Sequence, residues 1–450
     1  MTKNRMSGHI FLYIPLAIGW LLLVFLCLER VAWESTPVRG LSVVLSLYAL
    51  GLLYIQSQFK FNFTIAYASY LFISLLGIPT IEFLSPGSIE QFILQVSPYI
   101  LRWYQAGVVD YAILISALGV TSFVIGASLF SKPKQATQPI IIGLDTQGNQ
   151  LVYRFGAFLL IISALYLFVM IVSGRFVLFT IYNNLFTTLG TIPGYSYFLV
   201  AYATSITLIV ATGDRSQIIK MGALYGLIAV ILMISGNRGE IFYASAATLA
   251  ILGRRGMQIN TRLVIIILIV FFLIIPFIRQ TRNLSIGERQ LNNFEFNIGE
   301  PFIELGFQLR IINAVVIWTD RGEDFALGGT YILPLQRLIG IVVPFIERPD
   351  YSGSLYFFSE RLPGQGFSVV GEAYYNYGVP GVIGILGIIG GYLSRFGNTA
   401  SNKYLAFHGA ILAILINNIR NSFIFVPGQI LIILGLFALI HLLSKQDTAK

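Results

Sequence analysis

The stretch FGAFLLIISALYLFVMIV, residues 155–172, contains eighteen consecutive residues without a charge. A helix of this length crosses roughly 30 Å of hydrocarbon, the thickness of the apolar layer of a bilayer. Similar runs recur along the chain, and 56% of its 450 residues are hydrophobic while only 11% are charged. An ordinary soluble domain carries roughly 25% charged residues. The sequence therefore predicts an all-α, polytopic membrane helical bundle.

The apolar runs predict twelve membrane spans, with both chain ends in the cytoplasm. This orientation puts all eight lysines on the cytoplasmic side, where membrane proteins collect basic residues. The net charge of +9 then reflects membrane topology, and we assign it no role in nucleic-acid binding. The predicted spans are residues 10–29, 40–57, 62–80, 109–130, 154–173, 196–212, 219–235, 239–253, 262–278, 372–393, 404–418 and 424–443.

Under this topology, residues 279–371 form one large external segment of a single membrane domain, residues 1–450. All eight basic residues of the segment are arginines, set against ten Asp and Glu. The runs PFIELGFQLRIINAVVIW (301–318) and ILPLQRLIGIVVPFIERP (332–349) predict short amphipathic helices that lie on the membrane surface or fold over the bundle. A loop of this length is usually functional, so we expect a lid.

The sequence lacks the motifs of several kinds of catalytic and binding site. The sequence has no phosphate-binding Gly-rich loop ending in Lys, no His-Glu-x-x-His and no Asp-x-Asp pair, so we predict no metal and no cofactor. Its one cysteine, Cys27, excludes a disulfide. The three histidines, His9, His408 and His441, map to the cytoplasmic ends of spans. An external acid or base is therefore expected to be a carboxylate.

Three arginines and an acid flank the predicted spans on the external side. Arg238 and Glu240 lie in the short turn of ISGNRGEIF, where a charge close to hydrocarbon is costly and usually functional or paired. Arg279 and Arg282 leave the ninth span on one helical face, at i and i+3. Their guanidinium forks match the oxygens of a diphosphate. Anchoring to lipid, or pairing of Arg238 with Glu240, is the alternative interpretation.

Two further external arginines extend this pattern. Arg337 lies in the apolar segment LQRLIGIVVPFIERPD, and Arg420 lies in the short turn NNIRNSF. Because the external side has many arginines and no lysine, we predict that it recognises phosphate. Ordinary surface pairing with the ten acids would explain several of the arginines equally well.

The motif GQGFSVVGEAYYNYGVPG places Glu372, Tyr375 and Asn376 at i, i+3 and i+4 of the tenth span, on one face. A carboxylate partly removed from water can take a proton from a sugar hydroxyl, and aromatic rings stack on sugars. The alternative is that Glu372 caps the helix and that the tyrosines belong to an interfacial belt. Glycines follow every three or four residues, which is typical of close helix packing. They are Gly378, Gly381, Gly384, Gly387 and Gly391.

In this order, the motifs resemble those of Wzy-type O-antigen and oligosaccharide repeat-unit polymerases over residues 220–430. The matching pieces are Gly-x-Arg-Gly at 236–239, basic residues after the next span, LPLQRLIGIVVPFIERP, FSVVGEAYYNYGVPG and Arg420. The resemblance implies a GT-C-like, metal-independent membrane glycosyltransferase of the bacterial inner membrane, acting at the periplasmic face in O-antigen or exopolysaccharide synthesis. Its implied partners are undecaprenyl-diphosphate-linked oligosaccharides, membrane lipids and a chain-length regulator, and no nucleic acid.

The resemblance also implies roles for the residues singled out above. The growing glycan would move from its undecaprenyl diphosphate to a sugar hydroxyl of an incoming lipid-linked repeat unit. Glu372 would be the general base, and Arg238 the second catalytic residue. The diphosphate would be bound by Arg279, Arg282, Arg337 and Arg420. The sugars would be bound by Tyr375, Asn376 and Glu240.

Two other functions remain as alternatives. Twelve helices with both ends inside are also the layout of flippases and other transporters, although these usually show two related halves. An O-antigen ligase would perform similar chemistry, but ligases often carry a histidine in the large external loop, and residues 279–371 have none.

Overall fold

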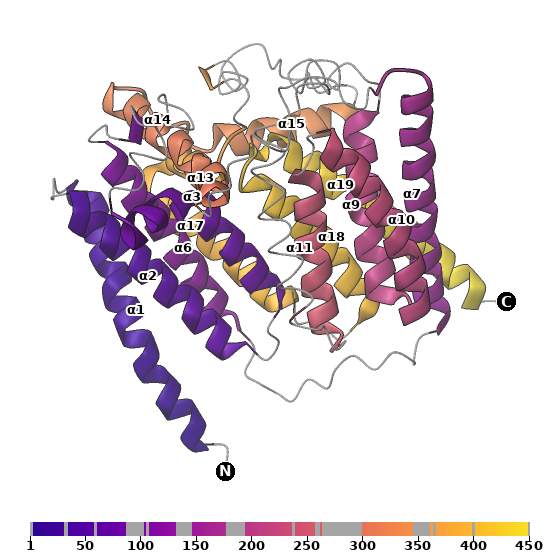
Figure 1. The fold of residues 1–450 in the computed structure, drawn as a ribbon, viewed down its shortest axis with the longest axis horizontal. Helices are drawn as coiled ribbons and strands as arrows, with labels where there is room; N and C mark the ends of the chain where they lie inside the picture. Colours follow the sequence, from indigo (N-terminus) through magenta and orange to yellow (C-terminus); the bar gives the residue numbers. More distant parts are fainter. Residues whose placement is uncertain are drawn as a thin grey trace, which may run out of the picture.

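The fold is a bundle of long helices crossed at one end by a shorter helix, α15 (Figure 1). This computed structural model describes residues 3–30, 35–57, 61–86, 103–104, 108–131, 146–176, 194–235, 239–256, 262, 299–343, 345, 361–362, 366–397 and 401–448. Within these ranges the regular secondary structure is entirely helical. The all-α prediction is therefore confirmed.

The long helices coincide with eleven of the twelve predicted spans. They are α1 (Lys3–Glu29), α2 (Ser35–Gln56), α3 (Phe63–Leu84), α6 (Val109–Leu129), α7 (Thr146–Val172), α9 (Tyr195–Thr212), α10 (Arg215–Ile234), α11 (Gly239–Arg254), α17 (Val369–Phe396), α18 (Asn402–Asn418) and α19 (Val426–Thr448). The remaining predicted span, 262–278, lies outside the described residues except for its first. Among the described residues, nine helical segments are long and apolar enough to cross a membrane, and two shorter helices are also apolar.

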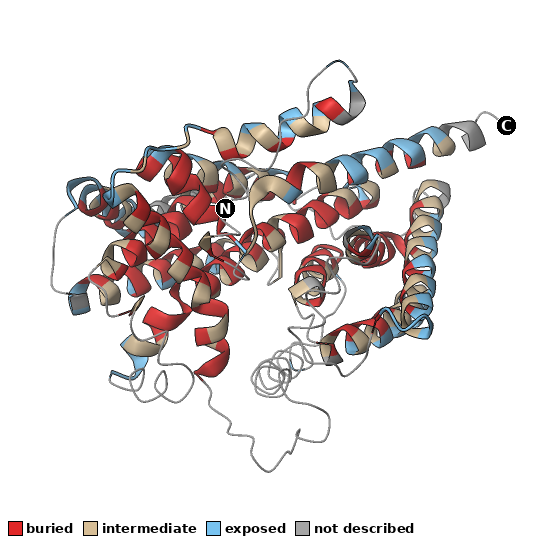
Figure 2. Ribbon diagram, turned by 90° about the horizontal axis from the view of Figure 1, so that it is seen from above, coloured by how far each residue is buried: buried red, intermediate tan, exposed pale blue. Residues whose placement is uncertain are grey.

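The burial of the helices fits a bundle surrounded by lipid. The central helix α6 is 83% buried over its most apolar window, whereas only 28% of the corresponding window of α7 is buried. Figure 2 shows exposed residues along the helix that ends at the C-terminus, α19, and buried residues in the middle of the bundle. Apolar side chains such as Phe168 and Leu442 are more than 60% exposed. A water-soluble protein rarely exposes such surfaces, but a lipid-facing helix does.

Glycines let α6 and α17 pack closely against each other. A Cβ added to Gly126 would come within 2.1 Å of the carbonyl oxygen of Gly387, and one added to Gly390 would come equally close to that of Phe123. The small residues let the two backbones touch, as the glycine spacing predicted. Gly384 differs, because an added Cβ there would meet no atom within 4 Å.

The amphipathic runs of the large external segment do form short helices, as predicted. They are α13 (Glu300–Leu305), η3 (Gly306–Gln308), α14 (Leu309–Asp320) and α15 (Gly329–Val342). The face of the bundle crossed by α15 is called the α15 face below; it also holds the N-terminal end of α17 and the turn 419–425 between α18 and α19 (Figure 1). The lid over residues 279–371 stays a prediction, because the structure describes only part of that segment.

The segment from α13 to α14 stays in the half of the bundle nearest the α15 face. At its start, Phe302 packs against Gly77, about two turns from the end of α3. At its end, Asp320 forms an ion pair with Arg30, directly after α1. Glu300–Asp320 has the length and apolarity of a span. Both of its ends nevertheless lie toward one face, as expected for helices folded against the bundle.

Helix α17 is broken at Gly378, whose φ of 63° and ψ of −147° are not helical. A side chain at this positive φ would be strained, so glycine is required. Pro380 has no N–H to donate to the carbonyl four residues before it. Residues 326 and 327 instead donate backbone hydrogen bonds of 3.0 Å to the carbonyl oxygens of Tyr375 and Asn376. The break thus fastens the segment leading into α15 to the N-terminal half of α17.

Candidate active site

Glu372 lies in the first turn of α17 and is 1% exposed. Its Oε2 accepts the backbone N–H of Phe423 at 2.8 Å, and its Oε1 lies 3.5 Å from the hydroxyl of Ser422. Burial of a carboxylate is costly unless it is hydrogen-bonded, and these contacts offset that cost. Glu372 is thus an acid in the first turn of its own helix, and its carboxylate also joins α17 to the turn 419–425.

Asn376 and Thr330 fasten α15 to α17 beside this carboxylate. The side-chain amide of Asn376 donates to the Thr330 hydroxyl at 2.7 Å and to the Glu372 carbonyl oxygen at 2.8 Å. Thr330 also lies beside the Glu372 carboxylate. Both side chains are buried. Three separate segments of the chain, α15, α17 and the turn 419–425, thus converge on one carboxylate.

Tyr331 adds a hydroxyl that the sequence analysis did not single out. Its ring packs edge-on against Phe423, with 5.1 Å between centroids. Its hydroxyl oxygen is buried, and among the described residues it has no hydrogen-bond partner. Burial raises the pKa of this phenol, and the negative charge of Glu372 raises it further. A buried hydroxyl without a partner is unusual in a native protein, and it is free to donate to a bound molecule.

Arg337 and Arg420 reach this part of the α15 face from two elements. Arg337 follows Thr330 by seven residues, about two helical turns, and therefore shares its side of α15. Arg420 precedes Ser422 by two residues in the turn that contacts Glu372. Both arginines are half-buried and both have partners. The fold thus brings these two sequence-predicted cations into the segments that hold Glu372.

Tyr375 belongs to a second cluster, because it projects to another side of α17 than Glu372. Its hydroxyl donates to Glu323 at 2.8 Å, and Glu323 forms an ion pair of 2.7 Å with Arg361. The Arg361 guanidinium lies 3.8 Å from the ring centre of Trp318, which packs edge-on against Tyr375. Both rings are buried, so the half-buried carboxylate and guanidinium are the groups of this cluster that can hydrogen-bond a sugar hydroxyl.

The other predicted site residues fall where the structure gives no side-chain geometry. Arg238, Arg279 and Arg282 lie outside the described residues. Glu240 lies in the first turn of α11, and its side chain is not described. In the described part of the chain, no three His, Cys, Asp or Glu side chains group closely enough to hold a metal ion.

Comparison with known proteins gives two matches. The family model for the O-antigen polysaccharide polymerase Wzy matches residues 11–449. Protein CapE of Staphylococcus aureus is 28% identical over 380 residues, which cover 84% of this chain and 84% of CapE. No solved structure matches.

Proposed function

Because the chain belongs to the O-antigen polysaccharide polymerase Wzy family, we propose that it transfers a growing glycan from undecaprenyl diphosphate to an incoming lipid-linked repeat unit. The family match over residues 11–449 carries this proposal. The reaction occurs at the α15 face, which we assign to the outer side of the bacterial cell membrane.

The distribution of lysines supports this orientation. Among the described helices, lysines lie near the helix ends opposite the α15 face. They are Lys3 of α1, Lys220 of α10, Lys403 of α18 and Lys445 of α19. Lysine collects on the cytoplasmic side of membrane proteins, so the α15 face is external and both chain ends are cytoplasmic. Lipid-linked substrates then reach the site from the outer leaflet.

The proposed step forms one glycosidic bond and breaks another. The hydroxyl oxygen of the acceptor sugar attacks the anomeric carbon of the donor glycan. As it attacks, Glu372 accepts the proton of that hydroxyl. The bond from that carbon to the diphosphate oxygen breaks, and undecaprenyl diphosphate leaves with the electron pair. Glu372 then releases its proton to water. For this step Glu372 must exchange its bond to Phe423 for the substrate hydroxyl, which requires a shift of the turn 419–425.

Guanidinium groups stabilise the leaving diphosphate. Arg337 and Arg420 lie on the two elements that hold Glu372, and we add Arg238, Arg279 and Arg282 from their place in the family motifs. Cations aimed at developing negative charge lower the barrier without a metal. The cluster of Tyr375, Glu323 and Arg361 binds sugar through its carboxylate and guanidinium, and Glu240 also binds sugar. Asn376 acts as a positioning residue, because its amide is bonded within the protein.

The test is a gel of surface polysaccharide from cells in which the encoding gene is deleted and then restored. Loss of the polymer ladder, leaving core with a single repeat unit, is expected, and the restored gene should recover the ladder. Loss of every glycosylated band would instead indicate a flippase. Accumulation of unattached lipid-linked polymer would indicate a ligase. Either of these two results would overturn the proposal.

A further inference from the structure

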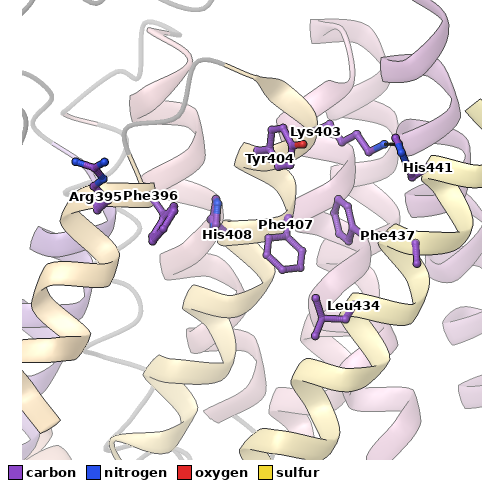
Figure 3. Close-up of a pocket in the computed structure, with 10 residues that line it drawn as sticks. Arg395, Phe396, Lys403, Tyr404, Phe407, His408, Leu434, Phe437 and His441 are labelled. Carbon is purple, nitrogen blue, oxygen red and sulfur yellow. Dashed lines mark hydrogen bonds between the residues drawn. The ribbon is translucent and has the colours of Figure 1, made fainter.

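A cationic cavity of about 730 Å³ lies between α17, α18 and α19, at the end opposite the α15 face. Figure 3 shows Arg395, Lys403 and His441 toward one end of this cavity, and Phe407 and Leu434 farther along it. Arg395 lies at the last turn of α17, and Lys403 at the first turn of α18. The charged end is therefore at the level of helix termini, where lipid headgroups lie.

The charges at this end are not neutralised by acids in the cavity wall, which contains neither Asp nor Glu among the described residues. Arg395 is exposed, and within the described chain no ion pair or hydrogen bond occupies its guanidinium. The Lys403 ammonium lies 3.3 Å from Nδ1 of His441. Since an ammonium can only donate, this Nδ1 accepts, and the Nε2 of His441 carries the ring proton.

A second cavity, of about 830 Å³, meets the first at Arg395 and Phe396. It lies between α1, α6 and α17, with Trp20, Leu129 and Ile388 in its wall. Gly384 lines it and leaves space that a side chain would fill. The only charged group in its described wall is Arg395. Two apolar cavities thus diverge from one cationic end.

We propose that this site binds one anionic, two-chain phospholipid of the cytoplasmic leaflet. The phosphate lies at Arg395, where the two cavities meet, one acyl chain lies along Phe407 and Leu434, and the other fills the cavity beside Gly384. A soluble anion would leave both apolar cavities empty. A single-chain polyprenyl phosphate would leave one of them empty. Basic pockets between helices on the cytoplasmic side suit such headgroups. The site is distinct from the Glu372 site, and only its place in the cytoplasmic leaflet rests on the orientation proposed for the chain.

The test is native mass spectrometry of the purified full chain in detergent, with dioleoyl phosphatidylglycerol, dioleoyl phosphatidylcholine, undecaprenyl phosphate or inorganic phosphate added. One phosphatidylglycerol should be retained in preference to the other three. The variant Arg395→Gln/Lys403→Gln should bind it about 25-fold more weakly, because each cation near an anionic lipid contributes a factor of about five. The control Arg154→Gln/Lys220→Gln, which removes two exposed charges outside both cavities, should bind normally.

A second variant tests the apolar cavity without removing charge. Gly384→Leu fills the space beside α17 without a steric clash at Cβ, and it should weaken retention of phosphatidylglycerol about tenfold while the chain stays folded. Equal retention of phosphatidylcholine, stronger retention of undecaprenyl phosphate, or unchanged binding in both the charge variant and Gly384→Leu would overturn the proposal.

Discussion

The substitution Glu372→Gln separates two roles of this side chain, proton acceptor and anchor of the turn 419–425. The amide oxygen of Gln can still accept the Phe423 N–H, which now lies 2.8 Å from Oε2. An amide cannot accept the proton of a sugar hydroxyl. Loss of a general base typically lowers a rate by about 10²–10⁴-fold. Replacing a charged by a neutral acceptor should destabilise the fold by only about 1 kcal/mol.

Glu372→Ala is the matched variant that removes both roles. It leaves the buried Phe423 N–H without its partner, at a cost of about 1–3 kcal/mol. The Ala variant should therefore unfold at a clearly lower temperature than the Gln variant, and both should be inactive. The assay is incorporation of labelled lipid-linked repeat unit into polymer by the purified protein in liposomes, with thermal unfolding followed by tryptophan fluorescence. A Glu372→Gln protein that polymerises within tenfold of the wild-type rate would refute the base assignment and leave Glu372 an anchor.

Three further predictions concern neighbouring residues. Tyr331→Phe removes a buried hydroxyl that has no partner among the described residues. The melting temperature should therefore stay equal or rise while polymerisation slows. A fall of both would contradict a role of this hydroxyl in binding substrate. Arg420→Gln should lower kcat/KM by about 10²-fold through lost charge stabilisation, and Arg420→Lys should recover part of it; equal rates in the two variants would argue against diphosphate binding. Gly378→Ala, at φ 63°, should destabilise the fold by about 1–3 kcal/mol in thermal unfolding, whereas Gly222→Ala, with open space and no positive φ, should not.

The sequence alone identified the helices well, because a membrane span is a local property. A window such as residues 155–172 needs only its own composition to be insoluble in water, and its backbone groups must bond within the segment when it enters lipid. Neighbouring helices then change its ends by a few residues. The amphipathic runs that form α14 and α15 can also be recognised from the segment alone, since the periodicity of their apolar residues shows which side of the helix is apolar.

The candidate site was predictable only in part. Glu372 and Arg420 stand out in the sequence because charges are rare in this chain. Thr330, Tyr331 and Ser422 carry no such signal, since neutral polar residues are common in apolar helices and bond locally to their own backbone. The sequence analysis also did not predict the break of α17 at Gly378, because the spacing of this glycine matches that of the packing glycines that follow. Its position two residues before Pro380 is the hint in the sequence that the helix is interrupted.

The sequence by itself thus determined the membrane environment and the number and extent of most helices, and it predicts the side of the membrane to which charged turns belong. These follow from hydrophobic transfer energy and from the distribution of Lys and Arg, which sum over local segments. Only the tertiary structure brought Ser422 and Phe423 to a carboxylate fifty residues earlier, and only it turned Tyr375 away from Glu372. These contacts arise because a buried polar group must find whichever partner the packed helices present, and that choice depends on the whole bundle.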